Sequence, residues 1–307
     1  MYRHRAPPRH PTGTEPGTAP PGRPMNTFRA RAAETLLALA RPYLALHLGV
    51  LGVEIRRAPF PRDSSSATLP GPRAARLLVV GDLAASGYGV LLHGMAFPAQ
   101  LAGAWSVRTG RGCSWTTIAD PLMTVRRAAH HPRLGTAAAA ADAVVVALGV
   151  PDVLQLTASA DVVASVGRLV VRVRSAAGRD VPVLLAGLPP MTQFQGLPPA
   201  AARLIGSQLQ RLDDALRQVA AQHVGVGFVA FPSWDLGGST LRRAFSFGAM
   251  HRGWAVAVAA RLELPDLGSA PDPDRDPESA VVVQAEQVAE EAAVAPDATG
   301  GPLTLAA

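Results

Sequence analysis

The sequence contains no lysine, a single cysteine and few aromatic residues, and these scarcities exclude several kinds of site and partner. Because all 29 basic residues are arginine, we attribute the basic excess to compositional bias rather than to a binding surface. Cys113 alone excludes an intramolecular disulfide framework and a cysteine-based zinc site. Aromatic residues make up 5% of the chain and are not interleaved with the arginines, so no nucleic-acid partner is expected despite a net charge of +6.

The charge is divided unevenly along the chain. Residues 265–307 carry nine acidic residues and one arginine, so the rest of the chain holds 28 basic and 14 acidic residues. Composition divides the sequence into five parts. We expect a disordered Pro/Arg-rich segment at 1–26, an apolar helical segment at 27–57, a linker at 58–75, a folded domain at 76–264 and an acidic, mostly disordered tail at 265–307.

The apolar segment at 27–57 has three interpretations that stay open. From Thr35 to Val53 its only formal charge is Arg41, with further arginines on both flanks. It could be a weak membrane span, an interfacial helix that binds a membrane surface, or a helix packed on the domain. Glu34 and the lack of a clear cleavage site argue against a cleavable signal peptide. A bacterial type of protein, either cytoplasmic or membrane-associated, fits these features.

Short apolar runs alternate with helical stretches between residues 76 and 264. Continuous apolar strands separated by helices predict a parallel sheet covered on both faces, which is a three-layer α/β/α sandwich. Functional residues in such sheets lie beyond the carboxyl ends of the strands. The expected strands are Arg76–Val80, Ser114–Ile118, Ala143–Leu148, Val181–Ala186 and Gly227–Phe231, and the expected helices are Ala84–Arg108, Met123–His130, Ala160–Ala177, Pro199–His223 and Trp254–Leu262.

Cofactor-binding signatures are missing from the strand ends. The segment from Gly81 to Gly89 has neither the G-x-G-x-x-G spacing of dinucleotide sites nor the Gly-Lys-Ser/Thr of a phosphate-binding loop. His130 and His131 are adjacent, but no third ligand stands at metal spacing. We therefore expect no cofactor and no metal.

Four segments fall in one characteristic order. They are Gly81-Asp82, Leu148–Asp152, Leu185–Met191 and His251 ahead of Trp254. Over roughly residues 76–262, this ordered set resembles the sequence blocks of the SGNH (GDSL) hydrolases. The resemblance implies an SGNH-hydrolase, flavodoxin-like α/β/α fold and acyl-ester hydrolysis. That chemistry needs a serine nucleophile, a histidine base, an aspartate that orients the histidine, and oxyanion donors.

Four positions depart from the pattern that the resemblance implies. Leu83 stands at the nucleophile position, Leu122 at the oxyanion glycine and Pro151 at the oxyanion asparagine. Gly248 replaces the aspartate three residues before His251, which is retained. Leucine cannot attack a carbonyl, and proline has neither a side-chain amide nor a backbone N–H.

The departures predict an SGNH-type domain that has lost catalysis and keeps a binding or interaction role. Its partner could be an acyl or lipid-like ligand, or a membrane surface through residues 27–57, while the oligomeric state stays open. The expected ligand pocket comprises Gly81, Asp82, Leu83, Leu122, Gly149, Pro151, Asp152 and Met250.

An active carboxylester hydrolase remains the alternative, with Ser86 as a non-standard nucleophile and His251 as its base. Ser86 follows Leu83 by three residues, about 4.5 Å further along a helix axis, which near-attack geometry does not tolerate. Asp152 is expected to cap the next helix or its loop. Asp235 could orient His251 only if its loop folds back.

Overall fold

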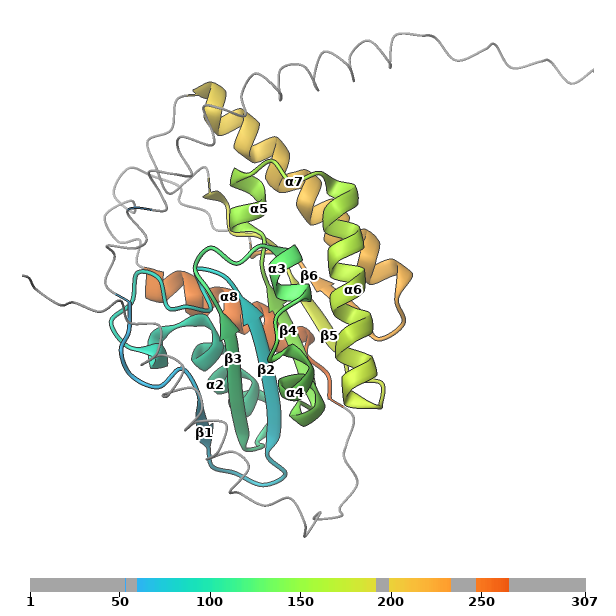
Figure 1. The fold of residues 1–307 in the computed structure, drawn as a ribbon. Helices are drawn as coiled ribbons and strands as arrows, with labels where there is room; N and C mark the ends of the chain where they lie inside the picture. The colour runs from blue at the N-terminus through green and yellow to red at the C-terminus, as the bar shows by residue number, and fades with distance from the viewer. Residues whose placement is uncertain (1–52, 54–59, 192–198, 233–246, 265–307) are drawn as a thin grey trace, which may run out of the picture. The chain divides into compact units, whose positions relative to one another are not determined.

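The computed structural model describes residue 53 and residues 60–191, 199–232 and 247–264 (Figure 1). The expected disordered N-terminus, the acidic tail and, apart from Val53, the apolar helical segment fall outside the described residues. Among the helices that are described, none has both the length and the apolar character to cross a bilayer.

Six strands form one sheet, in the order β1-β3-β2-β4-β5-β6. The neighbouring strands from β3 to β6 in this order pair in parallel, which confirms the predicted central sheet. The strands are β1 (Ala67–Leu69), β2 (Ala75–Gly81), β3 (Cys113–Ala119), β4 (Ala143–Ala147), β5 (Val183–Ala186) and β6 (Val226–Val229).

Helices cover both faces of the sheet, so the three-layer prediction is confirmed. Two helices, α2 and α8, pack together on one face, and α3 to α7 lie on the other (Figure 1). The helices are η1 (His93–Met95), α2 (Phe97–Thr109), α3 (Val125–Ala129), α4 (Leu134–Ala140), α5 (Val150–Leu154), α6 (Ser159–Ala177), α7 (Pro199–Gln222) and α8 (Phe247–Arg261).

Three elements differ from the sequence prediction. The expected helix Ala84–Arg108 is replaced by a turn-rich loop, η1 and α2. Gly87 and Gly89 have φ angles of 80° and 77°, which no right-handed helix contains. The region expected to be a linker contributes β1, which pairs antiparallel with β3. Finally, α8 begins at Phe247, seven residues before the expected start.

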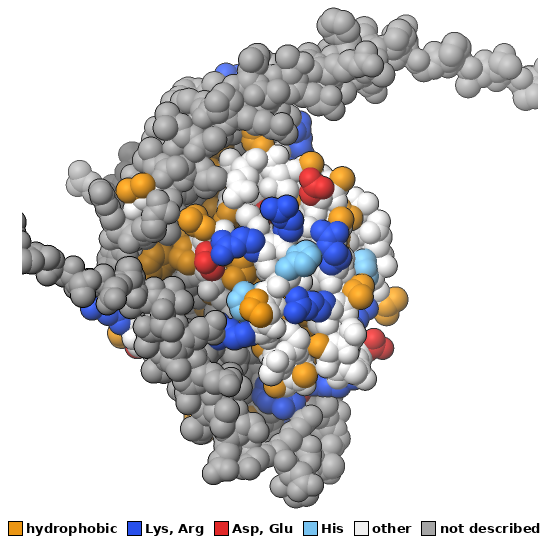
Figure 2. All heavy atoms as spheres, viewed as in Figure 1, with side chains coloured by type: hydrophobic (Ala, Val, Ile, Leu, Met, Phe, Trp, Pro, Cys, Tyr) orange, Lys and Arg blue, Asp and Glu red, His pale blue; other side chains and the backbone are white. Residues whose placement is uncertain are grey.

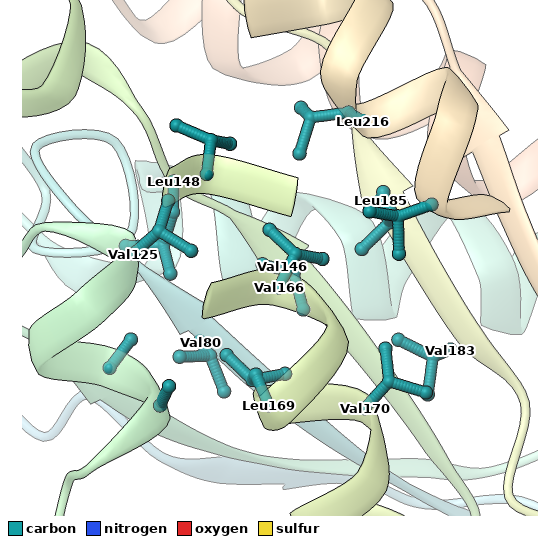
Figure 3. Close-up of a cluster of buried hydrophobic side chains, with 14 of the residues drawn as sticks. Val80, Val125, Val146, Leu148, Val166, Leu169, Val170, Val183, Leu185 and Leu216 are labelled. Carbon is teal, nitrogen blue, oxygen red and sulfur yellow. The ribbon is translucent and has the colours of Figure 1, made fainter. Parts of the chain in front are cut away.

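The core explains why the strands have apolar sequences. All five residues of β4 are buried, because helices cover both of its faces. Figure 3 shows Val80 and Val146, from β2 and β4, on the same side of the sheet as Val166 and Leu169 of α6. This packing holds the strands rigid, so their carboxyl ends present the following loops at defined positions.

Candidate functional site

The segments after β2 and β4 meet at the carboxyl edge of the sheet. Gly81 pairs with Ala147 in the register, and the next carboxylate, Asp82, is buried. Its Oδ2 accepts hydrogen bonds from the backbone N–H groups of Gly149 and Val150, each at 2.9 Å. Asp82 therefore links the two loops that the sequence blocks predict to lie together.

Two glycines allow this close approach. A Cβ on Gly81 would lie 2.4 Å from the Cβ of Ala85, closer than two carbon atoms can approach. Gly149 has a φ of 138°, and a Cβ there would lie 2.7 Å from the Leu188 Cδ2. Neither position can hold a larger residue without movement of the loop.

The environment of Asp82 favours its protonated form. Burial raises the pKa of Asp82 to about 7, although the N–H groups of Val150 and Gly149 oppose the shift. The negative charge of Asp152 acts in the same direction as burial. The carboxyl group is thus only partly ionised near neutral pH, and its Oδ2 already accepts two backbone hydrogen bonds.

Asp152 occupies a second buried position of the same kind. Its Oδ2 accepts a hydrogen bond of 2.9 Å from the backbone N–H of Val125, the first residue of α3. The Asp152 carboxylate also forms a hydrogen bond with the Thr157 side chain. Burial raises the pKa of Asp152. The carboxylate caps α3 and so connects α3 with α5, as a structural rather than a catalytic group would.

Asp213 makes a third link that the sequence does not reveal. The helical pattern predicts a solvated carboxylate, but Asp213 accepts a 3.0 Å hydrogen bond from the backbone N–H of Leu188. Burial raises its pKa as well. Because 25 residues separate the partners and no motif marks Asp213, the sequence gives no sign that α7 contacts the loop after β5.

Ser86 uses its hydroxyl locally. The Ser86 Oγ donates to the backbone carbonyl of Asp82 at 2.9 Å, and the Ser86 N–H donates to the same oxygen at 2.9 Å. These bonds close a single turn after β2. The structure gives Ser86 no hydrogen bond to His251 among the described residues.

His251 lies fully buried in α8. No side chain in the described part of the chain is hydrogen-bonded to either ring nitrogen, and the polar group beside the ring is the backbone of Met95. Burial lowers the pKa of His251 to about 4, and the backbone of Met95 only partly opposes this shift. The imidazole is neutral at physiological pH, and Asp235, its conceivable orienting group, falls outside the described residues.

Apolar groups face the position three residues before His251. A Cβ on Gly248 would lie 3.5 Å from the Met95 Cε and 3.9 Å from the Val90 Cγ1. A carboxylate at this position would therefore meet apolar neighbours as well as the imidazole. Gly248, which the sequence predicts to replace the orienting aspartate, thus has apolar neighbours.

The other predicted pocket residues have separate roles. Leu83 is half-buried and packs on the hydrophobic core. The N–H of Leu122 donates to the Oδ1 of Asp120 at 2.8 Å. Pro151 and Met250 are buried in α5 and α8, on opposite faces of the sheet. The structure therefore brings together Gly81, Asp82, Gly149 and Asp152.

The model of the GDSL-like lipase/acylhydrolase family matches residues 79–255, which is more than half of the chain. The chain belongs to this family. The match begins inside β2 and ends inside α8, so it includes every block identified in the sequence. Among curated proteins, none matches the sequence.

Solved structures of similar fold include TesA, a lipase and an esterase. TesA is 20% identical, with a TM-score of 0.46 over 61% of this chain and 98% of its own. The lipase Lip_vut3 from a goat rumen metagenome is 16% identical, with a TM-score of 0.48 over 62% and 100%. The SGNH-hydrolase family esterase AlinE4 is 19% identical, with a TM-score of 0.42 over 72% and 98%.

Membership of the GDSL family implies a catalytic role for each site position. Hydrolysis in such a site requires a nucleophile and a base that share a hydrogen bond. In the described residues, His251 has no such partner, and Leu83 occupies the position next to Asp82. No group of three or more potential metal ligands occurs within the described ranges.

Proposed function

We propose that this GDSL-family domain does not hydrolyse esters and that it acts by binding. The observation that carries the proposal is Leu83, which follows Gly81-Asp82 directly and packs its side chain on the core. Leucine has no proton to lose and no lone pair to attack with, so the covalent route has no starting point.

The histidine at the base position supports the same conclusion. A general base must reach the proton that it abstracts and must have a pKa near the working pH. His251 is fully buried, has no side-chain hydrogen-bond partner among the described residues, and has a pKa of about 4. This environment suits a neutral packing residue better than a proton acceptor.

The oxyanion positions support it as well. The N–H of Leu122 already donates to the Asp120 carboxylate, and Pro151 has no N–H to donate. One oxyanion donor contributes about 2.7–4 kcal/mol to transition-state stabilisation. Loss of two donors removes most of what the family site would supply even if a nucleophile were present.

The ligand that fits these replacements carries an acyl chain. Leu83 and Leu122 put apolar, half-buried side chains where a hydrolase holds polar groups. Apolar surface at the strand ends favours a hydrocarbon chain over a sugar or a nucleotide. We accordingly propose an acyl or lipid-like ligand that is held and released unchanged.

The test uses the full chain with a fluorophosphonate probe and short-chain aryl esters. We expect no labelling and no hydrolysis above the uncatalysed rate, together with an acyl compound identified by mass spectrometry in the purified protein. An active GDSL esterase in parallel shows that the probe and the substrates work.

Two variants distinguish the remaining outcomes. Labelling that disappears in Ser86→Ala and in His251→Leu would overturn the proposal and establish Ser86 as the nucleophile of an active esterase. Labelling unaffected by both variants would identify another nucleophile and would overturn it equally. If neither activity nor a bound acyl compound is found, the proposed loss of catalysis stands and the proposed acyl ligand is rejected.

A further inference from the structure

An open groove lies along α6, on the face of the domain that Figure 2 shows (Figure 2). Its volume is about 710 Å³, and α3, α4, α6 and the segment after α7 contribute to its wall. We call it the α6 groove and define it by Ala129, His130, Arg168, Val171, Arg172 and His223.

The polar side chains of the α6 groove are nearly all basic. Its lining includes two arginines, two histidines and one serine, and no carboxylate occurs among the lining residues. Figure 2 shows arginine and histidine side chains gathered over the same face. An anionic partner would therefore meet attraction and no direct repulsion in the groove.

Contacts within the chain hold both arginines in place. Arg168 Nη2 donates to the Ser165 Oγ at 3.0 Å, and Arg172 Nη1 donates to the Ala129 carbonyl at 3.1 Å. A guanidinium has five N–H donors, so each arginine keeps donors for a ligand. Carboxylates suit these donors because the planar guanidinium can bind two oxygens at once.

Small and apolar residues also line the groove. Gly135 of α4 and Ala176 of α6 are among them, and a Cβ built on Gly135 would lie at an ordinary contact distance of 3.9 Å from the Cβ of Ala176. Val171 is 61% exposed and adds an apolar contact beside the arginines. Such a surface fits a helix with one apolar face and acidic residues along its margin.

Nucleic acid fits this groove less well. Single-stranded bases bind proteins mainly by stacking on aromatic rings, and histidine is the only ring-bearing residue in the lining. The open groove also offers a larger contact surface than a single phosphate group could cover. The combination of small apolar residues and paired arginines favours a polypeptide.

We propose that the α6 groove binds an acidic amphipathic helix from a partner protein. The apolar side of that helix lies on Val171 and the small residues, and its carboxylates pair with Arg168 and Arg172. The groove lies apart from Asp82 and His251, so the proposal stands whether or not the domain hydrolyses esters.

The test measures binding of a labelled 16-residue helical peptide of alanine, valine and glutamate to the full chain by fluorescence anisotropy. We expect Arg168→Glu to weaken binding at least tenfold, because the variant replaces attraction by repulsion. Arg168 is exposed, so the fold should survive, which circular dichroism and thermal unfolding check. Arg261→Glu makes the same charge change on α8, on the opposite face of the sheet, and should leave binding unchanged.

A second peptide with glutamine for every glutamate separates charge from apolar contact. We expect it to bind at least tenfold more weakly. Equal binding of the two peptides, or equal weakening by Arg168→Glu and Arg261→Glu, would overturn the proposal. It would also fail if heparin, duplex DNA or anionic lipid vesicles displaced the acidic peptide at equal concentration of negative charge, since that result would indicate a general polyanion surface.

Discussion

The carboxylate of Asp82 accepts the backbone N–H of Gly149 across the carboxyl edge of the sheet, at 2.9 Å. This bond joins two loops that are 67 residues apart in the sequence. Asp152 and Asp213 bind backbone N–H groups in the same way at neighbouring loops. Buried and half-buried carboxylates thus organise the loops at the carboxyl edge of the sheet in this GDSL-family domain.

Asp82 should make the domain less stable as pH rises. Its pKa is about 7 in the folded chain against 3.8 as a free side chain, so the folded state holds the proton more tightly. The stability from this group is complete below about pH 4 and is lost as pH rises through about 7.

Asp82→Asn should remove that dependence, since asparagine can still accept both N–H bonds. We expect the difference in unfolding free energy, wild type minus variant, to fall between pH 4 and pH 7 in urea titrations. A difference that stays constant over this range would contradict the assigned environment. Asp214→Asn, at an exposed carboxylate of α7, serves as the control for removal of one acidic group.

His251 should have the opposite pH dependence. Its pKa falls from 6.5 to about 4 on folding, so the unfolded chain binds the proton more tightly. The stability from neutral His251 is present above about pH 6.5 and is lost as pH falls through about 4. The difference in unfolding free energy, wild type minus His251→Leu, should therefore fall on acidification. A histidine paired with a carboxylate would instead stabilise the wild type at low pH.

Leu83→Ser should not produce an esterase. The other positions would still lack their chemistry, because the N–H of Leu122 is engaged by Asp120, Pro151 has no N–H, and no described side chain orients His251. We expect aryl-ester hydrolysis to stay at the uncatalysed rate. Loss of packing on the core should lower the unfolding free energy by about 1–2 kcal/mol. Hydrolysis blocked by a fluorophosphonate in this single variant would show that the site remains functional.

Gly149→Ala should destabilise the domain by more than about 1 kcal/mol. The added Cβ would lie 2.7 Å from Leu188, at a φ of 138° that side chains rarely adopt. Gly103→Ala is the matched control, because α2 leaves open space at that position. A glycine within a helix costs about 0.5–1 kcal/mol relative to alanine, so Gly103→Ala should stabilise. Thermal unfolding compares the two, and an equal response would contradict the assigned strain at Gly149.

Prediction from sequence succeeded where the pattern is local. The five parallel strands follow from apolar runs, because a strand between two helical layers needs apolar residues on both faces. It was wrong for β1 and for the start of α2. The three residues of β1 are mostly exposed, so they carry no hydrophobic signal, and the turns at Gly87 and Gly89 interrupt an otherwise helical pattern.

The sequence by itself determined the family and the layered fold, and it predicts four departures from the catalytic pattern, because these depend on residue types and their order. The tertiary structure alone decided the environments of those residues. It buries His251 without a side-chain partner among the described residues, turns the Ser86 hydroxyl to the backbone carbonyl of Asp82, and places Asp82 against Gly149. Solvent exclusion and hydrogen bonding depend on segments far apart in the chain, and no local pattern of residues encodes which of them will meet.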